Sequence, residues 1–202
     1  MAYFPFFIDL NGAEGLIVGG GAVALRKAEK LLPYGAHLTV IAEDFHPQLQ
    51  ENPAIKCLGI PFTDIALEGK KFVIAATDDA ELNHTIACAC QARNILVNVV
   101  DDKENCGFLF PALVKRGELT VGISTGGISP SAAVYAKDRI EEMLPESLEE
   151  ILSFLGDTRE MIKKRISPEK RSVVFKALFS VCMEQGRPLK ENEVTEILGD
   201  LI

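Results

Sequence analysis

A glycine-rich turn is the part of the chain whose residue types and spacing most clearly imply chemistry. Gly19, Gly20 and Gly21 follow the apolar run 16–18, and Ala24 completes the pattern G-x-G-x-x-A. Gly19 permits a tight turn after a strand, Gly21 lets the backbone approach a pyrophosphate closely, and small Ala24 lets the following helix pack on the strand. The pattern predicts a dinucleotide-binding turn, although a glycine-rich strand exit can also be a plain turn.

An acidic pair stands at the distance expected for a ribose ligand. The run 37–42 leads into Glu43 and Asp44, and Glu43 follows Gly21 by 22 positions. A carboxylate about 20 residues after the glycines accepts hydrogen bonds from the adenosine ribose in dinucleotide-binding domains. No Lys or Arg lies between residues 40 and 52 to hold a 2′-phosphate. The pair therefore predicts NAD rather than NADP, while either acid alone is equally typical of a polar loop.

The elements around these residues alternate between strand and helix. We expect helices over 22–32, ended by Pro33 and Gly35, and over 80–92. Predicted strands cover 16–18, 37–42, 55–60, 71–77 and 95–100. This alternation predicts an α/β fold with a Rossmann-type, doubly wound parallel sheet.

Four predicted strands end at residues able to contact a ligand. These residues are Gly19, Glu43, Thr77 and Asp101. Ligands of such sheets bind beyond the carboxyl ends of the strands. We therefore expect the four residues to face one crevice, with Thr77 among the cofactor contacts. Asp101 has an alternative interpretation, in which it and Asp102 only begin the loop that follows the strand.

A different pattern follows residue 101. Two strands over 108–114 and 119–124 are joined by a short turn, and Ser129 and Pro130 are typical of a helix start. That helix ends near Met143, and we expect further helices over 146–155, 158–166, 168–184 with Ser167 as cap, and 190–198. The first nine residues predict an edge strand. The expected division is an NAD-binding domain over 1–112, a small α+β region over 113–145 and a helical domain over 146–202.

Composition excludes several classes of protein. The chain of 202 residues is 48% hydrophobic with a net charge of −8, which argues against general nucleic-acid binding. The N-terminus lacks the basic region of a secretory signal and is too interrupted to span a membrane. Five cysteines without C-x-x-C favour a reducing cytoplasm, and Cys88 and Cys90, two apart on a predicted helix, point in different directions. We expect a cytoplasmic protein without a resident metal.

Five motifs, taken in order, resemble the siroheme synthase family, specifically its precorrin-2 dehydrogenase module. They occupy 16–28, 75–79, 98–101, 108–111 and 124–130. The match covers about residues 1–150, and the ordered combination is more specific than any single motif. The resemblance implies NAD-dependent oxidation of precorrin-2 to sirohydrochlorin, a step toward siroheme, by a homodimer that associates through the segment after the dinucleotide domain.

The resemblance also implies roles for particular residues. The family's cofactor contacts fall on Ala22, Val23, Glu43 and Asp44, its functional aspartate falls on Asp101, and a serine near the mouth of its active site falls on Ser124. Oxidation of a reduced tetrapyrrole sends a hydride to the nicotinamide and a proton to a base or to solvent, so one carboxylate beside the nicotinamide would suffice.

Two alternatives stay open at this stage. Some relatives also insert iron in the same pocket, and a non-catalytic NAD-sensing module would need the glycine turn and Glu43 but not Asp101. A basic stretch bears on the substrate, because residues 159–176 hold seven Lys and Arg against two Glu. This stretch could attract a polyanionic tetrapyrrole, or it could be an ordinary solvated helix face.

Overall fold

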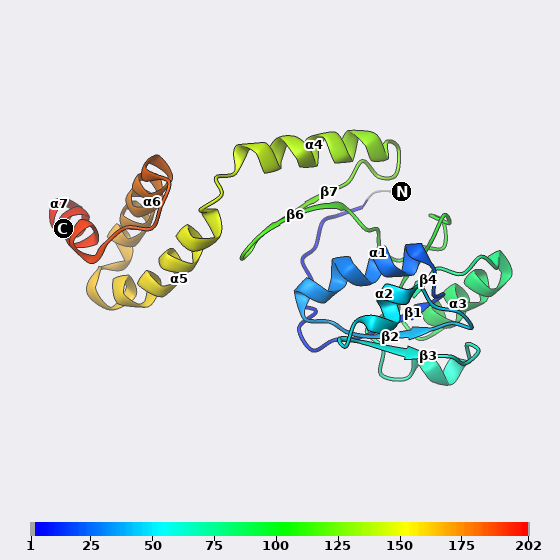
Figure 1. Ribbon diagram of the computed structural model, residues 1–202. Coiled ribbons are helices and arrows are strands. Elements are labelled where there is room, and N and C mark those ends of the chain that lie inside the picture. Colours follow the sequence, from blue (N-terminus) through cyan, green and yellow to red (C-terminus); the bar gives the residue numbers. More distant parts are fainter. Residues whose placement is uncertain (1–2, 202) are drawn as a thin grey trace. The chain divides into compact units, whose positions relative to one another are not determined.

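The computed structural model describes residues 3–201 and separates them into two units (Figure 1). One unit is Phe4–Phe110, and the other runs from Pro111 onward and includes Tyr3. Each unit has its own hydrophobic core. The further division expected at residue 145 stays a prediction.

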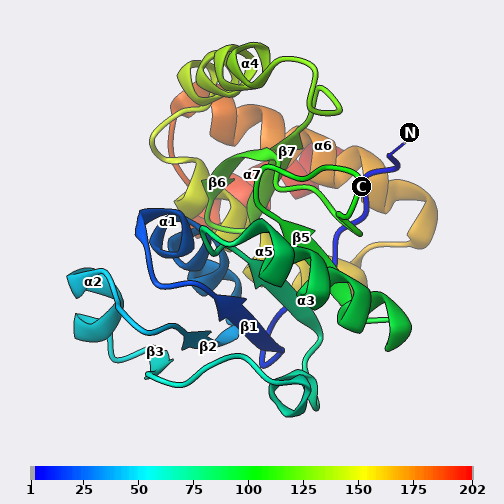
Figure 2. The same cartoon turned by 90° about the vertical axis from the view of Figure 1, so that its right-hand side faces the viewer.

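The unit Phe4–Phe110 is built on a parallel sheet with the strand order β3-β2-β1-β4-β5. Its strands are β1 (Glu14–Val18), β2 (His37–Ile41), β3 (Ile55–Leu58), β4 (Phe72–Ala75) and β5 (Leu96–Val99), and Figure 2 shows β3, β2 and β1 side by side. The helices are α1 (Ala22–Leu31), α2 (Pro47–Glu51) and α3 (Ala80–Ala92), with 3-10 turns η1 (Leu32–Tyr34) and η2 (Asp64–Leu67). The predicted Rossmann-type α/β fold is confirmed.

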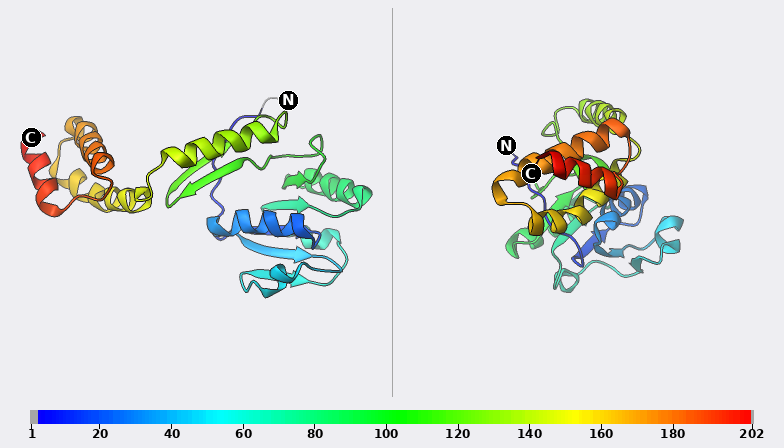
Figure 3. Two further views of the ribbon diagram at one scale, coloured as in Figure 1. Left: turned by 45° about the horizontal axis from the view of Figure 1, so that its top comes forward. Right: turned by 90° about the vertical axis from the view of Figure 1, so that its left-hand side faces the viewer.

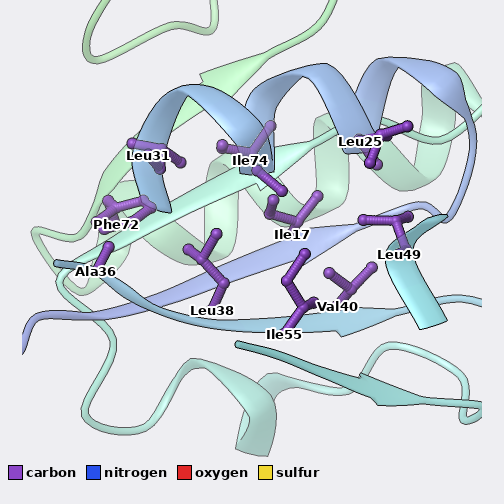
Figure 4. Packing of buried hydrophobic residues seen from close by; sticks show 12 residues of the cluster. Ile17, Leu25, Leu31, Ala36, Leu38, Val40, Leu49, Ile55, Phe72 and Ile74 are labelled. Atoms are coloured by element: carbon purple, nitrogen blue, oxygen red, sulfur yellow. The ribbon is translucent and has the colours of Figure 1, made fainter. Parts of the chain in front are cut away.

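Both faces of this sheet are buried, which explains why its strands are nearly continuous apolar runs. On one face, Ile17 and Ile74 pack beneath Leu25 and Leu31 of α1 (Figure 4). On the other face, residues such as Leu16 and Val73 pack against Ile86 of α3. Burying one such side chain contributes roughly 1.5–3 kcal/mol, so the alternation of faces along β1 locks its register.

The N-terminal segment departs from the prediction. Residues 3–10 form no strand, and Phe4, Phe6 and Phe7 are each at least 75% exposed, while Met1 lies outside the described residues. Pro5 has no N–H to donate to a strand ladder. Beside β5, moreover, the sheet edge is taken by the segment 106–110, where the Gly107 N–H donates to the carbonyl of Val97 at 2.7 Å. The expected edge strand is therefore wrong.

The second unit pairs an antiparallel ribbon with helices (Figure 3). The ribbon consists of β6 (Ala112–Arg116) and β7 (Leu119–Ile123), and α4 (Pro130–Met143) packs along it. The helices α5 (Leu148–Arg165), α6 (Pro168–Gln185) and α7 (Glu191–Leu201) then pack in sequence, with Ile151, Leu178 and Val194 in their core. None of the helices described combines the length and the apolar character needed to cross a bilayer.

Three local predictions in this unit meet different outcomes. Ser129 caps α4, accepting from the Ala132 N–H at 3.2 Å, as predicted. Ser167 occupies the first position before α6, but its side chain makes no cap bond. The predicted strand from residue 108 begins only at Ala112, because the carbonyl of Phe108 is bonded to the Asn98 side chain instead of to a strand partner.

Helix α5 is continuous where the sequence predicts two helices broken near residue 157. Gly156 lies in its interior, and the hydroxyl of buried Thr158 donates to the Phe154 carbonyl at 2.7 Å. A glycine inside a helix costs about 1 kcal/mol relative to Ala, which is less than the burial of Ile151 and Ile162 on either side contributes. Core packing therefore overrides the local break.

Two glycine substitutions of the same kind should have opposite effects on stability. A Cβ at Gly156 would meet no atom within 4 Å in an ordinary helical backbone, so Gly156→Ala should raise the free energy of unfolding by about 1 kcal/mol. Gly186 ends α6 with φ of 66°, and Gly186→Ala should lower the free energy of unfolding by about 1–2 kcal/mol. Urea unfolding followed by circular dichroism measures both. Destabilisation by both changes would contradict the continuous α5.

Candidate functional site

The carboxyl ends of four strands meet at one edge of the sheet. Val18 at the end of β1 pairs with Ile41 of β2 and with Ala75 of β4, and Ala75 pairs with Val99 of β5. Beyond β1 the chain first builds the strands on one side and then crosses to β4 on the other, so the order reverses between β1 and β4. Parallel sheets bind ligands at such a switch point.

Backbone bonds extend this alignment one residue past the strands. The Gly19 N–H donates to Ile41 at 2.8 Å, the Ala76 N–H to Val18 at 2.8 Å and the Val100 N–H to Ala75 at 2.9 Å. The predicted ligand-contacting residues that follow the four strand ends therefore lie along a single row. Its members are Gly19, Glu43, Thr77 and Asp101.

Two glycines of the turn are needed for close backbone approaches. Gly19 has φ of 114°, and a Cβ there would lie 2.2 Å from the carbonyl oxygen of Ala76. A Cβ on Gly20 would lie 2.0 Å from the carbonyl oxygen of Asp44, and the Gly20 carbonyl accepts from the His46 N–H at 2.7 Å. Gly20, to which the sequence pattern gives no role, allows the segment after β2 to lie against the turn.

The third glycine faces open space at the start of α1. Gly21 is the N-cap residue, and a Cβ there would meet nothing within 4 Å. Among the described residues no side chain caps α1, so the N–H groups of its first turn, including those of Ala22 and Val23, are free for an anion. Ala24 is fully buried against the sheet, as its small size predicts. The turn thus has the room and the donors that a pyrophosphate requires.

The acidic pair lies beside this turn. Glu43 and Asp44 follow β2, and both are exposed. The contact between Asp44 and Gly20 brings the pair next to the glycines although more than twenty residues separate them in the sequence. Exposed carboxylates at this place can accept hydrogen bonds from ribose hydroxyls.

Thr77 is held by a buried amide. The Asn83 Oδ1 accepts from the Thr77 N–H at 3.2 Å and lies 2.8 Å from the Thr77 hydroxyl, and the Asn83 Nδ2 donates to the Thr77 carbonyl at 2.9 Å. Asp79 caps α3 through the N–H groups of Glu81 and Leu82. The Thr77 side chain therefore stabilises the turn after β4. Its partner Asn83 was missed, and a polar residue on the apolar face of the predicted helix was the available signal.

Asp101 and Asp102 have different tasks in the structure. Asp101 is exposed with φ of 60°, a left-handed conformation that Asp tolerates better than most residues, and it reverses the chain after β5. Asp102 accepts from the N–H groups of Glu104 and Asn105, and the Asn105 side chain, which donates at 2.6 Å, lowers the pKa of Asp102. Asp102 thus opens the loop, whereas Asp101 presents its carboxylate at the sheet edge.

A polar cluster that no sequence pattern indicates joins α1 to β5 and the segment after it. The Lys27 Nζ donates to the Asn98 Oδ1 at 3.1 Å and lies 3.7 Å from the centroid of the Phe110 ring. The Asn98 Nδ2 donates to the carbonyl of Phe108 at 3.0 Å and lies 3.4 Å from the Cys106 Sγ. Burial lowers the pKa of Lys27 to about 8.

Ser124 belongs to the other unit and follows β7. It is exposed, and its Oγ accepts from the Gly126 N–H at 3.1 Å. The Thr125 hydroxyl binds both the N–H and the carbonyl of Ser129. The segment 124–129 is thus a hydrogen-bonded turn that leads into α4. In the part of the chain that the structure describes, no three His, Cys, Asp or Glu side chains gather as ligands for a metal ion.

Comparison with known proteins supports this picture. The chain is 39% identical over 178 residues to a siroheme synthase of Methylobacillus flagellatus, covering 87% of this chain and 38% of that protein. It is 42% identical over 168 residues to one of Tolumonas auensis, with 82% and 36% covered. The chain thus spans less than two fifths of the length of these curated relatives. The resemblance to the siroheme synthase family is confirmed.

Among solved structures, the protein titled "SirC, precorrin-2 dehydrogenase" has the same fold, with a TM-score of 0.79, 24% identity and 98% of each chain covered. A family model described as "Putative NAD(P)-binding" matches residues 6–112, which hold the glycine turn, the acidic pair and Asp101. This match covers more than half of the chain and agrees with the nicotinamide dinucleotide that the sequence predicts. The chain therefore belongs to the putative NAD(P)-binding family.

Proposed function

We propose that this protein is an NAD-dependent dehydrogenase that oxidises precorrin-2 to sirohydrochlorin on the way to siroheme. One observation carries the proposal: an uncapped, glycine-lined helix start and the exposed carboxylate of Asp101 share one edge of one sheet. The names of the similar proteins, siroheme synthase and precorrin-2 dehydrogenase, supply the substrate.

The residues at the sheet edge fit an NAD molecule. The first-turn N–H groups of α1 would bind its pyrophosphate, the open space at Gly21 would admit it, and Glu43 would accept hydrogen bonds from the ribose. When bound, NAD supplies the acceptor for a hydride. The chain's own contribution is to hold the substrate and to accept the accompanying proton at the carboxylate of Asp101 or pass it to water.

The proposal extends to assembly and location. We propose that the protein forms a homodimer through residues 113–145. We also propose that Ser124 lies near the bound substrate. A ribbon of only two strands, such as β6 and β7, exposes unpaired strand edges and is marginal by itself. Five free cysteines suit the reducing cytoplasm, where we place the protein.

An anaerobic assay tests the function directly. Purified protein with precorrin-2 and NAD should produce the absorbance of sirohydrochlorin together with that of NADH, and the same mixture with added Co²⁺ reports whether metal insertion follows. Neither product would form if the proposal is wrong.

Substitution of Asp101 should separate chemistry from folding. Asn adopts the same left-handed backbone as Asp but cannot accept the proton, so Asp101→Asn should lower kcat by about a hundredfold or more while NAD affinity stays within about twofold. The matched control Asp102→Asn keeps an oxygen for the N–H groups of Glu104 and Asn105 and should retain activity. Near-normal turnover of Asp101→Asn would remove Asp101 as the base.

The acidic pair should decide between the two nicotinamide cofactors. A carboxylate accepts the ribose hydroxyls of NAD and repels the 2′-phosphate of NADP. Neutralising it in Glu43→Gln/Asp44→Asn should reduce the ratio of NAD to NADP affinity by about tenfold, in line with a hydrogen bond to a charged group at about 1.5–3 kcal/mol. Isothermal titration of both cofactors measures the ratio. An unchanged ratio would show that the pair does not contact the ribose.

The basic group at the end of α5 should bind the substrate carboxylates. Lys163, Lys164 and Arg165 are exposed in the last turn of that helix. Reversing their charges with Glu should raise the KM for precorrin-2 by about tenfold and leave NAD affinity unchanged. The same change at exposed Lys30 and Lys56 serves as control, and the melting temperature reports any loss of helix stability. Unchanged kinetics would mean that this is an ordinary solvated face.

A further inference from the structure

Lys27 links the helix that follows the glycine turn to the strand that leads to Asp101. Its ammonium is half-buried, 3.1 Å from the Asn98 Oδ1 and 3.7 Å from the centroid of the Phe110 ring. Lys27 and Asn98 are 71 residues apart in the sequence. A lysine is seldom buried without a role, because removing an ammonium from water is costly.

Asn98 passes this link on to the chain segment after β5. Its side chain is buried, and its Nδ2 donates to the carbonyl of Phe108 at 3.0 Å. The Gly107 N–H, next to it, donates to Val97 at 2.7 Å. The segment 101–110 therefore begins at the left-handed Asp101, returns along β5 and ends with Phe110 beneath the ammonium of Lys27.

The charges around Lys27 define when it is protonated. Arg26 and Lys30 lie on its own helix, and Cys106 and Asp101 lie on the segment after β5. Burial, with a smaller contribution from the two cations, lowers the pKa of Lys27 to about 8, while the other two groups oppose this. Burial also raises the pKa of the Cys106 thiol above its usual range. Lys27 is thus mostly charged at neutral pH and mostly neutral above pH 8.

Stability alone explains this lysine poorly. Methionine has a similar length and would cover the same apolar surface without a desolvated charge. The contacts of the ammonium all lead to the segment that carries Asp101.

We propose that Lys27 is a positioning residue: through Asn98 and Phe110 it holds the segment 101–110 against α1 and so fixes Asp101 relative to the cofactor-binding turn at the start of the same helix. This inference rests on the proposed dehydrogenase function and deepens it. Lys27 itself is not expected to contact the nicotinamide ring or the tetrapyrrole substrate.

Kinetics of three variants test the proposal. Lys27→Met should lower kcat about tenfold with little change in the KM for NAD or in the melting temperature. Lys27→Arg keeps a cation over the face of the Phe110 ring and should have most of the wild-type kcat. Lys30→Met, which removes an exposed charge from the same helix and so favours the charged form of Lys27, should keep the wild-type kcat at pH 7. A normal kcat for Lys27→Met, or a loss matched by a large drop in melting temperature, would overturn the proposal.

The pH profile gives a readout that a structural role would not change. The wild-type kcat should fall as the pH rises through about 8, because deprotonation removes the cation over the Phe110 ring. Lys27→Arg should lack this fall, since a guanidinium stays charged. Identical profiles for the two proteins would contradict the role of Lys27.

Hydrogen exchange tests the anchoring without substrate. Amides of the segment 101–110, Gly107 above all, should exchange about tenfold faster in Lys27→Met, while those of α3 should not change. If the wild type is active but exchange is unaffected, only the inference about Lys27 fails. If the wild type produces no sirohydrochlorin, the proposed function fails. Faster exchange in Lys27→Met would then show that Lys27 anchors the segment 101–110 in a protein that does not catalyse this reaction.

Discussion

The site depends on how closely the backbone after β1 approaches its neighbours. A side chain at Gly19 would collide with the carbonyl of Ala76, and one at Gly20 would collide with the carbonyl of Asp44. These two approaches draw the segments after β4 and β2 against the start of α1. The register of the parallel strands then brings the ends of β1, β2, β4 and β5 into one row. Room for a cofactor at Gly21 is a consequence of this packing.

Buried amides hold the part of the row that follows β4 and β5. Asn83 fixes the turn after β4 through Thr77, and Asn98 fixes the segment after β5 through the carbonyl of Phe108. A buried polar group left without a partner costs about 1–3 kcal/mol, so each amide strongly favours the one loop conformation that satisfies it. The two asparagines, one on α3 and one on β5, thus fix the segments that follow the neighbouring strands β4 and β5. Only the second is tied to a charged residue, Lys27.

Much of the fold and the row of exits could be predicted because their signals are local. The G-x-G-x-x-A pattern, the alternation of strands and helices and the distance to Glu43 all lie within short windows of sequence. Gly20 and the pair of Lys27 and Asn98 could not be predicted, because their meaning comes from contacts between distant segments. The same reason explains the errors. Residues 3–10 form no strand, whereas the distant segment 106–110 bonds to β5, and α5 continues through Gly156 because its core outweighs a local preference.

We propose that one sheet edge holds both the cofactor and Asp101. This arrangement can be examined in a crystal structure of the protein with bound NAD. We expect the pyrophosphate on the first-turn N–H groups of α1, the adenosine ribose at Glu43 and the nicotinamide ring on the side of β5 that carries Asp101. A pyrophosphate bound away from the glycine turn, or a nicotinamide ring directed away from Asp101, would contradict it.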